Sequence, residues 1–213
     1  EALEQMRLAG WDEARLDEMR AKGWGNFARM VSDVPISHVR LDDGADVTIG
    51  ERTWTVMTGG GHTPEHACLV DQAGQIVIAG DQILPRITSN VSMMASEPTA
   101  DPLREWLDSI AKFRGSLTGD ELVLPAHGFP FTGVHARLDA LASGHIERLA
   151  VLEAALKQKP MRAVDTFGIL FARAVDDGVY GIATGEALAH LRYLECAGRA
   201  ICTVRNGVGW YSA

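Results

Sequence analysis

The twelve residues GGGHTPEHACLV, from Gly59 to Val70, decide how the rest of the chain is interpreted. Three glycines lead into His62, and an apolar run begins directly after His66. Glycine allows backbone turns that a Cβ would forbid, and histidine is the side chain that most often binds metal ions. The stretch therefore predicts a tight loop that presents an imidazole, followed by a strand. A hairpin loop in which one histidine caps a backbone group is the alternative that these residues leave open.

The composition indicates a globular protein from a reducing compartment. The chain has 213 residues, 46% of them hydrophobic, which suits one large domain or a medium domain with a small appendage. The formal net charge of −8 argues against general binding to nucleic acid phosphates. Three cysteines without a CxxC spacing indicate core filling and not a disulfide framework. We see no run of roughly eighteen apolar residues and no signal peptide pattern, so we expect a cytoplasmic protein without a membrane anchor.

Between residues 37 and 128 the pattern consists of short, β-branched runs bounded by Gly, Asp and Asn, which is typical of strands. A helix is expected to begin after Asp101, which would cap it, and to carry Trp106 and Ile110 on one apolar face. Strands that alternate with helices predict an α/β layer fold. The expected strands are residues 47–50, 52–57, 66–70, 75–80 and 122–125.

Residues 1–36 show a helical pattern that Gly10 and the step Gly23–Gly25 interrupt. Large apolar side chains recur there at helical spacing, and two interpretations stand. The stripe packs against a neighbouring surface, or it forms a mobile cover over a ligand site, because methionine adapts to varied shapes. We expect a helical insertion or cover. The stripe includes Trp11, Met19, Trp24, Phe27 and Met30.

A long helix is expected at about residues 135–157, with an interruption at Gly144 that allows a bend there. The texture of the sequence changes after Pro160. We therefore predict two domains, residues 1–145 and 146–213.

The second of these domains has the element order of a winged helix. Helices are expected at 162–173 and at 184–198, where Thr184 would be the cap. Asn206–Gly207 is a strong signal for a two-residue turn, so residues 199–212 predict a hairpin.

Three polar side chains share a placement at the ends of expected strands. His62 lies in the loop before one strand, Asp81 follows the strand at 75–80, and His127 follows the strand at 122–125. Ligands gather at strand ends in layered α/β folds, because loops there project from a rigid base. Two imidazoles and a carboxylate suit Zn²⁺, Fe or Mn²⁺, and the two oxygens of Asp81 could bridge two ions. Each residue taken singly is also an ordinary loop residue.

The series GHTPEH, GD and PAHG, at these intervals, resembles the second half of the metallo-β-lactamase fold hydrolases. That superfamily includes glyoxalase II, lactonases, alkylsulfatases and nucleases. The resemblance runs from about Leu41 onward and implies the C-terminal part of an αββα sandwich. It implies that His62 binds a first metal ion, that Asp81 bridges two ions, and that His127 binds the second. The long helix and the winged-helix tail resemble the β-lactamase-like branch that carries such a C-terminal domain.

One departure from the family pattern is serious. The family motif HxHxDH, which supplies the other metal ligands, is absent, since none of the seven histidines has that spacing. We expect that the N-terminal half of the fold precedes Glu1, because His62, Asp81 and His127 would otherwise have little reason to remain together. A pseudo-enzyme that lost the motif is the alternative. Zn²⁺ generally takes four ligands, so we expect weak or absent metal binding, and no activity, in these residues alone.

Several residues near the three candidate ligands have two interpretations each. His66 orients a ligand or the loop, or is satisfied by the backbone at the start of a strand. Ser89 and Asn90 follow Asp81 closely enough to edge the pocket. Arg86 contacts an anionic group of the substrate or forms a surface salt bridge. Three further histidines lie in helical patterns and are interpreted as structural, namely His135, His145 and His190.

The resemblance implies that the intact protein is a metal-dependent hydrolase with two zinc ions, with Fe or Mn as alternatives. A metal-bound hydroxide would attack an acyl carbon, with Asp81 as the catalytic ligand. A small-molecule thioester or ester is the first substrate expected, and a lactone or β-lactam the second.

A nuclease of the same fold and a non-catalytic binding or scaffold protein are the other functions considered. Residues 146–213 carry eight basic and seven acidic side chains, a net charge of +1, and the helix that would enter a groove holds one arginine, Arg192. Phosphate binding needs a denser basic stripe. Nucleic acid is therefore not the expected partner, and the tail is interpreted as a packing or homodimerisation module.

Overall fold

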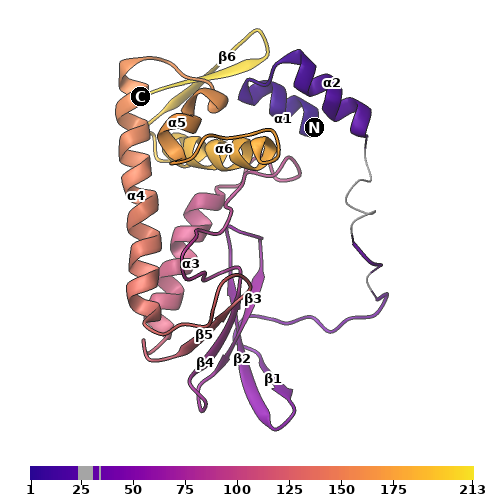
Figure 1. Cartoon of the computed structure of the whole chain (residues 1–213), viewed down its shortest axis with the longest axis vertical. Coiled ribbons are helices and arrows are strands. Elements are labelled where there is room, and N and C mark those ends of the chain that lie inside the picture. Colours follow the sequence, from indigo (N-terminus) through magenta and orange to yellow (C-terminus); the bar gives the residue numbers. More distant parts are fainter. Residues whose placement is uncertain (24–30, 34) are drawn as a thin grey trace.

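The computed structural model describes residues 1–23, 31–33 and 35–213 and shows a mixed α/β fold (Figure 1). A five-stranded sheet has the order β1-β2-β3-β4-β5, and β4 and β5 are its parallel pair. The parallel pairing follows from the helical crossover that joins these two strands. The strands are β1 (Asp46–Ile49), β2 (Arg52–Gly59), β3 (His66–Asp71), β4 (Ile76–Gly80) and β5 (Leu122–Pro125).

The strand register divides the sheet into two unlike faces. Val70 lies opposite Val77, which in turn pairs with Val123, so these three side chains share one face, and all three are buried. Ile78 and Leu122 belong to the other face and are 37% and 39% exposed. The sheet therefore has one face within the core and one partly open to solvent.

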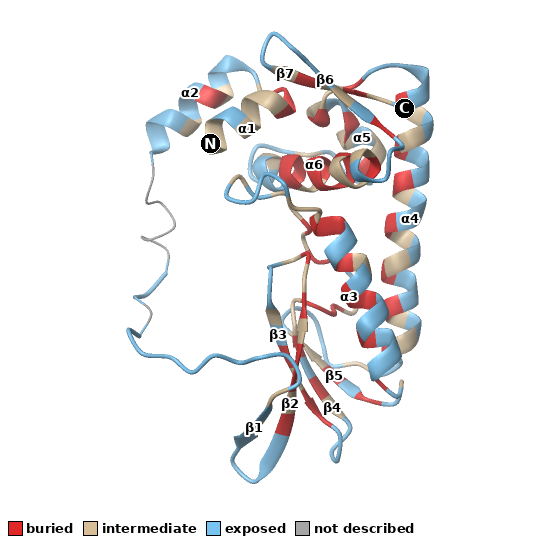
Figure 2. Cartoon of the chain, turned by 180° about the vertical axis from the view of Figure 1, so that it is seen from behind, coloured by how far each residue is buried: buried red, intermediate tan, exposed pale blue. Residues whose placement is uncertain are grey.

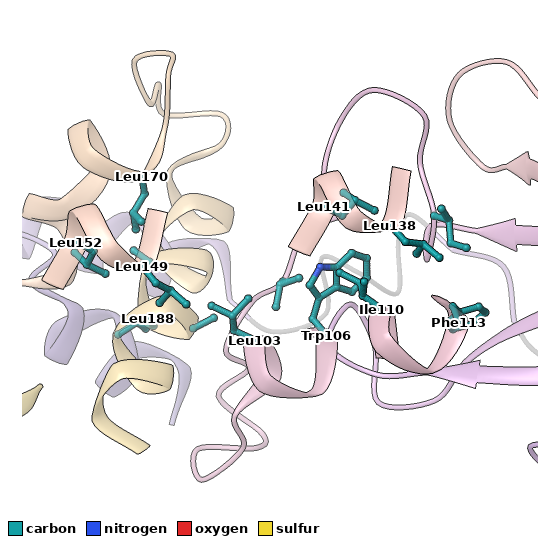
Figure 3. Packing of buried hydrophobic residues seen from close by; sticks show 14 of the residues in the cluster. Leu103, Trp106, Ile110, Phe113, Leu138, Leu141, Leu149, Leu152, Leu170 and Leu188 are labelled. Carbon is teal, nitrogen blue, oxygen red and sulfur yellow. The ribbon is translucent and has the colours of Figure 1, made fainter. Parts of the chain in front are cut away.

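Two helices cover the buried face, α3 (Pro102–Ser116) and α4 (Val134–Gln158). Asp101 accepts a hydrogen bond from the backbone N–H of Arg104, which confirms it as the cap of α3. Figure 3 shows Trp106 of α3 against Leu138 and Leu141 of α4. These side chains are almost fully buried, and they form the centre of the core.

The C-terminal unit packs on the ends of these helices. It contains a 3₁₀ turn (Ala163–Thr166), α5 (Phe167–Leu170), α6 (Tyr180–Cys196) and the hairpin β6 (Ile201–Arg205) and β7 (Val208–Ser212). Asn206 and Gly207 both have positive φ, which confirms the two-residue turn expected there. Figure 2 shows buried residues along α6, and Leu188, Leu191 and Leu194 form its core face as expected.

The N-terminal helices α1 (Ala2–Ala9) and α2 (Glu13–Lys22) lie beside α6 and the hairpin (Figure 1). Trp11 donates from Nε1 to the hydroxyl of Thr184 at 2.9 Å, which ties this segment to α6. The expected apolar stripe also included Trp24, Phe27 and Met30, which lie outside the described residues. No helix among the described residues is both long and apolar enough to cross a bilayer.

Three expectations about the helices were wrong. Helix α4 continues through Gly144 without a break, because burial of Leu141, Leu149 and Leu152 offsets the roughly 1 kcal/mol that a helical glycine costs. Thr184 does not cap α6, which begins at Tyr180. Its hydroxyl instead donates to the carbonyl oxygen of Tyr180, within the helix. The helix expected at 162–173 is reduced to the 3₁₀ turn and α5.

Candidate metal centre

The glycine-rich loop before His62 is held against α3. The backbone N–H of Gly60 donates to Oγ of Ser109 at 2.6 Å. Gly61 has a φ of 94°, and a Cβ there would lie 2.5 Å from Cβ of Trp106. Glycine is therefore required for this close approach, and the loop directs His62 toward the ends of β4 and β5.

Asp81 and His127 are brought together by the parallel pairing of β4 and β5. Gly80 pairs with Pro125, and the backbone N–H of Ala126 donates to the carbonyl oxygen of Gly80 at 2.9 Å. Asp81 directly follows Gly80, and His127 directly follows Ala126. Their side chains consequently leave the sheet at the same edge.

The imidazoles of His62 and His127 face the two carboxylate oxygens of Asp81. Nε2 of His62 lies 3.5 Å from Oδ2, and Nε2 of His127 lies 3.4 Å from Oδ1. Oδ1 is buried and has no hydrogen-bond partner among the described residues. A buried carboxylate oxygen without a donor is costly, so Oδ1 could accept a metal ion or another donor.

The ring of His62 is oriented by a contact of its other ring nitrogen. Nδ1 lies 2.8 Å from the carbonyl oxygen of Asn90. Because a carbonyl oxygen can only accept, Nδ1 carries a proton, and in the neutral imidazole the lone pair then lies on Nε2, which faces Asp81.

The donor separations fit divalent metal ions. Two ligands on a tetrahedral Zn²⁺, with bonds of about 2.0–2.1 Å, are roughly 3.3 Å apart. The His62–Asp81 and His127–Asp81 separations are close to this value. Each pair supplies only two donors, and in the described part of the chain no group of three donors surrounds one point. These two donor pairs, which share Asp81, are the candidate half-sites of a metal centre.

The other residues predicted near the site differ in their contacts. His66 packs on Gly80 and lies edge-on to the ring of His62, with 5.8 Å between ring centroids, and burial lowers its pKa. Ser89 is buried and donates to the carbonyl oxygen of Asp81. Asn90 acts through its backbone carbonyl, while its side chain accepts from Ser92. Arg86 is exposed and belongs to none of the ion pairs seen among the described residues.

Ser109 supports the histidine loop and is not among the site residues predicted from the sequence. Ser109 also donates to the carbonyl oxygen of Glu105 in its own helix. A signal was available, because Ser109 is a polar residue on the same helical face as Trp106, Ile110 and Phe113. A buried polar residue in an apolar stripe requires a partner.

Two family models match the chain. The model for the metallo-beta-lactamase superfamily matches residues 5–149, and the model for the metallo-beta-lactamase-like C-terminal domain matches residues 149–213. The first match begins well before Leu41, where the resemblance in the sequence begins. The two matches meet within α4.

Relatives of known structure and sequence agree with these models. A beta-lactamase domain protein from Burkholderia ambifaria is 40% identical, with a TM-score of 0.90 over 97% of this chain and 60% of that protein. A metallo-beta-lactamase family protein from Thermus thermophilus is 26% identical, with a TM-score of 0.72 over 84% of this chain and 55% of that protein. The probable metallo-hydrolase YqjP from Bacillus subtilis (strain 168) is 26% identical over 149 residues, 68% of this chain and 46% of that protein.

The chain thus spans about half the length of these relatives. Superfamily membership implies the use of divalent metal ions, typically zinc. With a family model over residues 5–149 and a matching C-terminal model, the chain belongs to the metallo-beta-lactamase superfamily.

Proposed function

We propose that the protein containing this chain is a hydrolase of small acyl compounds that uses two divalent metal ions, with zinc as the first choice. His62 and Asp81 would hold one ion, and Asp81 and His127 the other. One observation carries the proposal: each oxygen of Asp81 faces a different histidine nitrogen, and the buried Oδ1 lacks a donor among the described residues.

Hydrogen bonds within the chain hold two of these side chains in place without any bound ligand. Asn90 fixes the tautomer and direction of His62, and Ser89 holds the backbone of Asp81. Asp81 is the catalytic residue of the proposal, because it joins the two half-sites. Metal ions bound there would supply Lewis acidity and lower the pKa of water, which generates a nucleophile at neutral pH.

The favoured substrate is a thioester or ester, and a lactone or β-lactam is the second choice. Arg86 is exposed, lies five positions beyond Asp81 in the chain, and has no carboxylate partner among the described ion pairs. It is therefore available for an anionic group of the substrate.

A substrate screen with metal analysis tests the proposal. We expect the full-length protein to bind two zinc ions and to hydrolyse a member of these classes. Asp81→Asn and His62→Ala should each lower kcat/KM by at least about a hundredfold, in line with the loss of metal ligands. Exposed Arg20→Gln, on α2, is the matched control and should retain activity. Two bound ions without turnover, or turnover that survives Asp81→Asn, would exclude the proposal.

The 213-residue chain alone should be a weak metal binder and inactive, because it supplies two donors to each ion. Elemental analysis after dialysis should find fewer than two zinc ions per chain. Stoichiometric loading of both half-sites would contradict this part of the proposal.

We further propose that the winged-helix-like tail is a packing or dimerisation module in a cytoplasmic enzyme. Most of α6 is buried against α3, α4 and the 3₁₀ turn, including Leu188 and Leu191. A recognition helix must present a free face to a nucleic acid groove. This burial favours the acyl hydrolase over a nuclease.

A further inference from the structure

The segment that follows Asp81 is clamped by an arginine from a distant helix. Arg137, near the start of α4, donates from Nε to the carbonyl oxygen of Leu84 at 2.6 Å. It also donates from Nη2 to the carbonyl oxygen of Ile87 at 2.8 Å. Hydrogen bonds from a charged donor are roughly twice as strong as those between neutral groups.

The guanidinium of Arg137 is committed to these two carbonyls. Burial lowers its pKa, and within the described residues it has no carboxylate partner. A planar, forked donor suits two backbone oxygens better than a single ammonium does.

Both sides of the clamp are firmly packed. On α4, Val134 and Leu138 are buried, and Nε2 of His135 lies 2.9 Å from the carbonyl oxygen of Leu117. On the clamped segment, Ile83 and Leu84 are buried in the core. The clamp therefore joins two well-packed parts of the molecule, and its loss would move the connection between them.

The clamped turn lies directly against the residue after His127. Pro85 lies between the two clamped carbonyls, and a Cβ on Gly128 would be 2.8 Å from Cγ of Pro85. On the other side of His127, Ala126 is tied to Gly80. His127 thus sits between a strand-end hydrogen bond and a packing contact that depends on the turn.

We propose that Arg137 is a positioning residue that sets the place of His127 relative to Asp81. The inference rests on the proposed function, because the spacing matters through the metal ligands of the second half-site. The first half-site, with His62, has a support outside the clamped segment, because Ser109 of α3 holds the loop before His62, while the carbonyl oxygen of Asn90 holds its ring.

Zinc titration of the full-length protein tests the inference by isothermal calorimetry. We expect Arg137→Gln to lower the affinity for one of two ions by about 10–100-fold, the range found when supports of metal ligands are removed. The other ion should lose less affinity, because Ser109 still holds the loop before His62. Arg137→Lys keeps the charge but loses the forked donor, so its zinc affinity should lie between those of the wild type and Arg137→Gln. It replaces Arg137→Gln if that variant does not fold. Arg114→Gln is the matched control, because Arg114 joins α3 to the start of α4, through Asp139 and the ring of His135, without touching the turn.

Hydrogen exchange on the metal-free protein supplies a readout that needs no metal. Arg137→Gln should accelerate exchange in residues 82–89 and also in 126–129, while Arg114→Gln should change neither. Acceleration of exchange in residues 82–89 alone would overturn the inference. It would also be overturned if Arg137→Gln bound each of the two ions as tightly as the wild type does. If the wild type binds no zinc, the proposed function fails, and exchange at 126–129 alone decides the role of Arg137.

Discussion

Gly61 shows how little space the histidine loop leaves at its contact with α3. Besides the approach to Trp106, a Cβ at this position would lie 2.7 Å from the carbonyl oxygen of Pro102. Backbone atoms of a packed helix cannot move aside cheaply. The close contact with α3, which only glycine allows at residue 61, therefore holds the loop that orients His62.

Substitution of this glycine should be far more damaging than its backbone angle alone requires. Gly61→Ala should lower the free energy of unfolding by roughly 2–4 kcal/mol, combining overpacking with the strain of a positive φ. Gly50 also has a positive φ, 64°, but nothing lies within 4 Å of the position that an added methyl group would take, so Gly50→Ala should cost only about 1 kcal/mol. Urea denaturation of both variants measures the difference, and equal losses would show that the contact with α3 is unimportant.

Helix α6 meets α4 near ionisable side chains whose pKa values burial shifts in favour of the neutral forms. Nδ1 of His145 lies 3.3 Å from Nε2 of His190. Burial lowers the pKa of His145 to about 3 and that of His190 to about 4. Glu186 lies one turn before His190 on α6, and burial raises its pKa to about 7 despite the nearby positive charge of Arg148.

The raised pKa of Glu186 predicts a loss of stability as the pH rises. The folded state binds the proton more tightly than the unfolded state, whose pKa is near 4.5. The stabilisation is complete below pH 4.5 and is lost as the pH rises through 7. Glu186→Gln should therefore equal the wild type near pH 4.5 and exceed it at about pH 8 by on the order of 1–3 kcal/mol.

Denaturation curves of the two proteins at both pH values check this expectation, and contributions of the histidines cancel in the comparison. Glu147→Gln, at an exposed position of α4, is the control and should show no such pH dependence. A constant difference between the two pH values would contradict the assignment to Glu186.

For the whole molecule, the open face of the sheet is the most unusual surface. Ile78 and Leu122 project from neighbouring strands on that face, beside the half-buried Leu69 and Leu124. In the αββα arrangement that the resemblance implies, a second sheet covers this face. Exposed contiguous apolar surface promotes association.

The isolated chain should therefore self-associate through this face. The double variant Ile78→Lys with Leu122→Lys should shift the sedimentation profile toward monomer at equal concentration, because two like charges oppose close packing of apolar faces. Val151→Lys, at a position of α4 that is 57% exposed, is the control and should leave the profile unchanged. Unchanged association in the double variant would assign it to another surface.

Local signals explain how much of this architecture could be predicted. The α/β fold is confirmed, and so are the cap at Asp101 and the turn at Asn206–Gly207, because each depends on residues that are close in the sequence. The grouping of His62, Asp81 and His127 was expected from their positions at strand ends. Their roles as ligands stay a prediction.

What could not be predicted depends on partners that are distant in the sequence. The start of α6 was misplaced because the hydroxyl of Thr184 serves Trp11 and its own helix, and a single sequence does not reveal that pair. The clamp by Arg137 has the same character, since its acceptors are backbone carbonyls that any residue could supply.

The parallel pairing of β4 and β5 makes the two halves of the metal centre unequal in loop-closure entropy. His62 and Asp81 are connected through the β3–β4 hairpin, so a short stretch of chain brings them together. His127 reaches Asp81 only across the entire crossover through α3, which is a longer loop to close. Contacts between distant residues generally form late in folding. His127 should therefore reach Asp81 only after the crossover between β4 and β5 has folded.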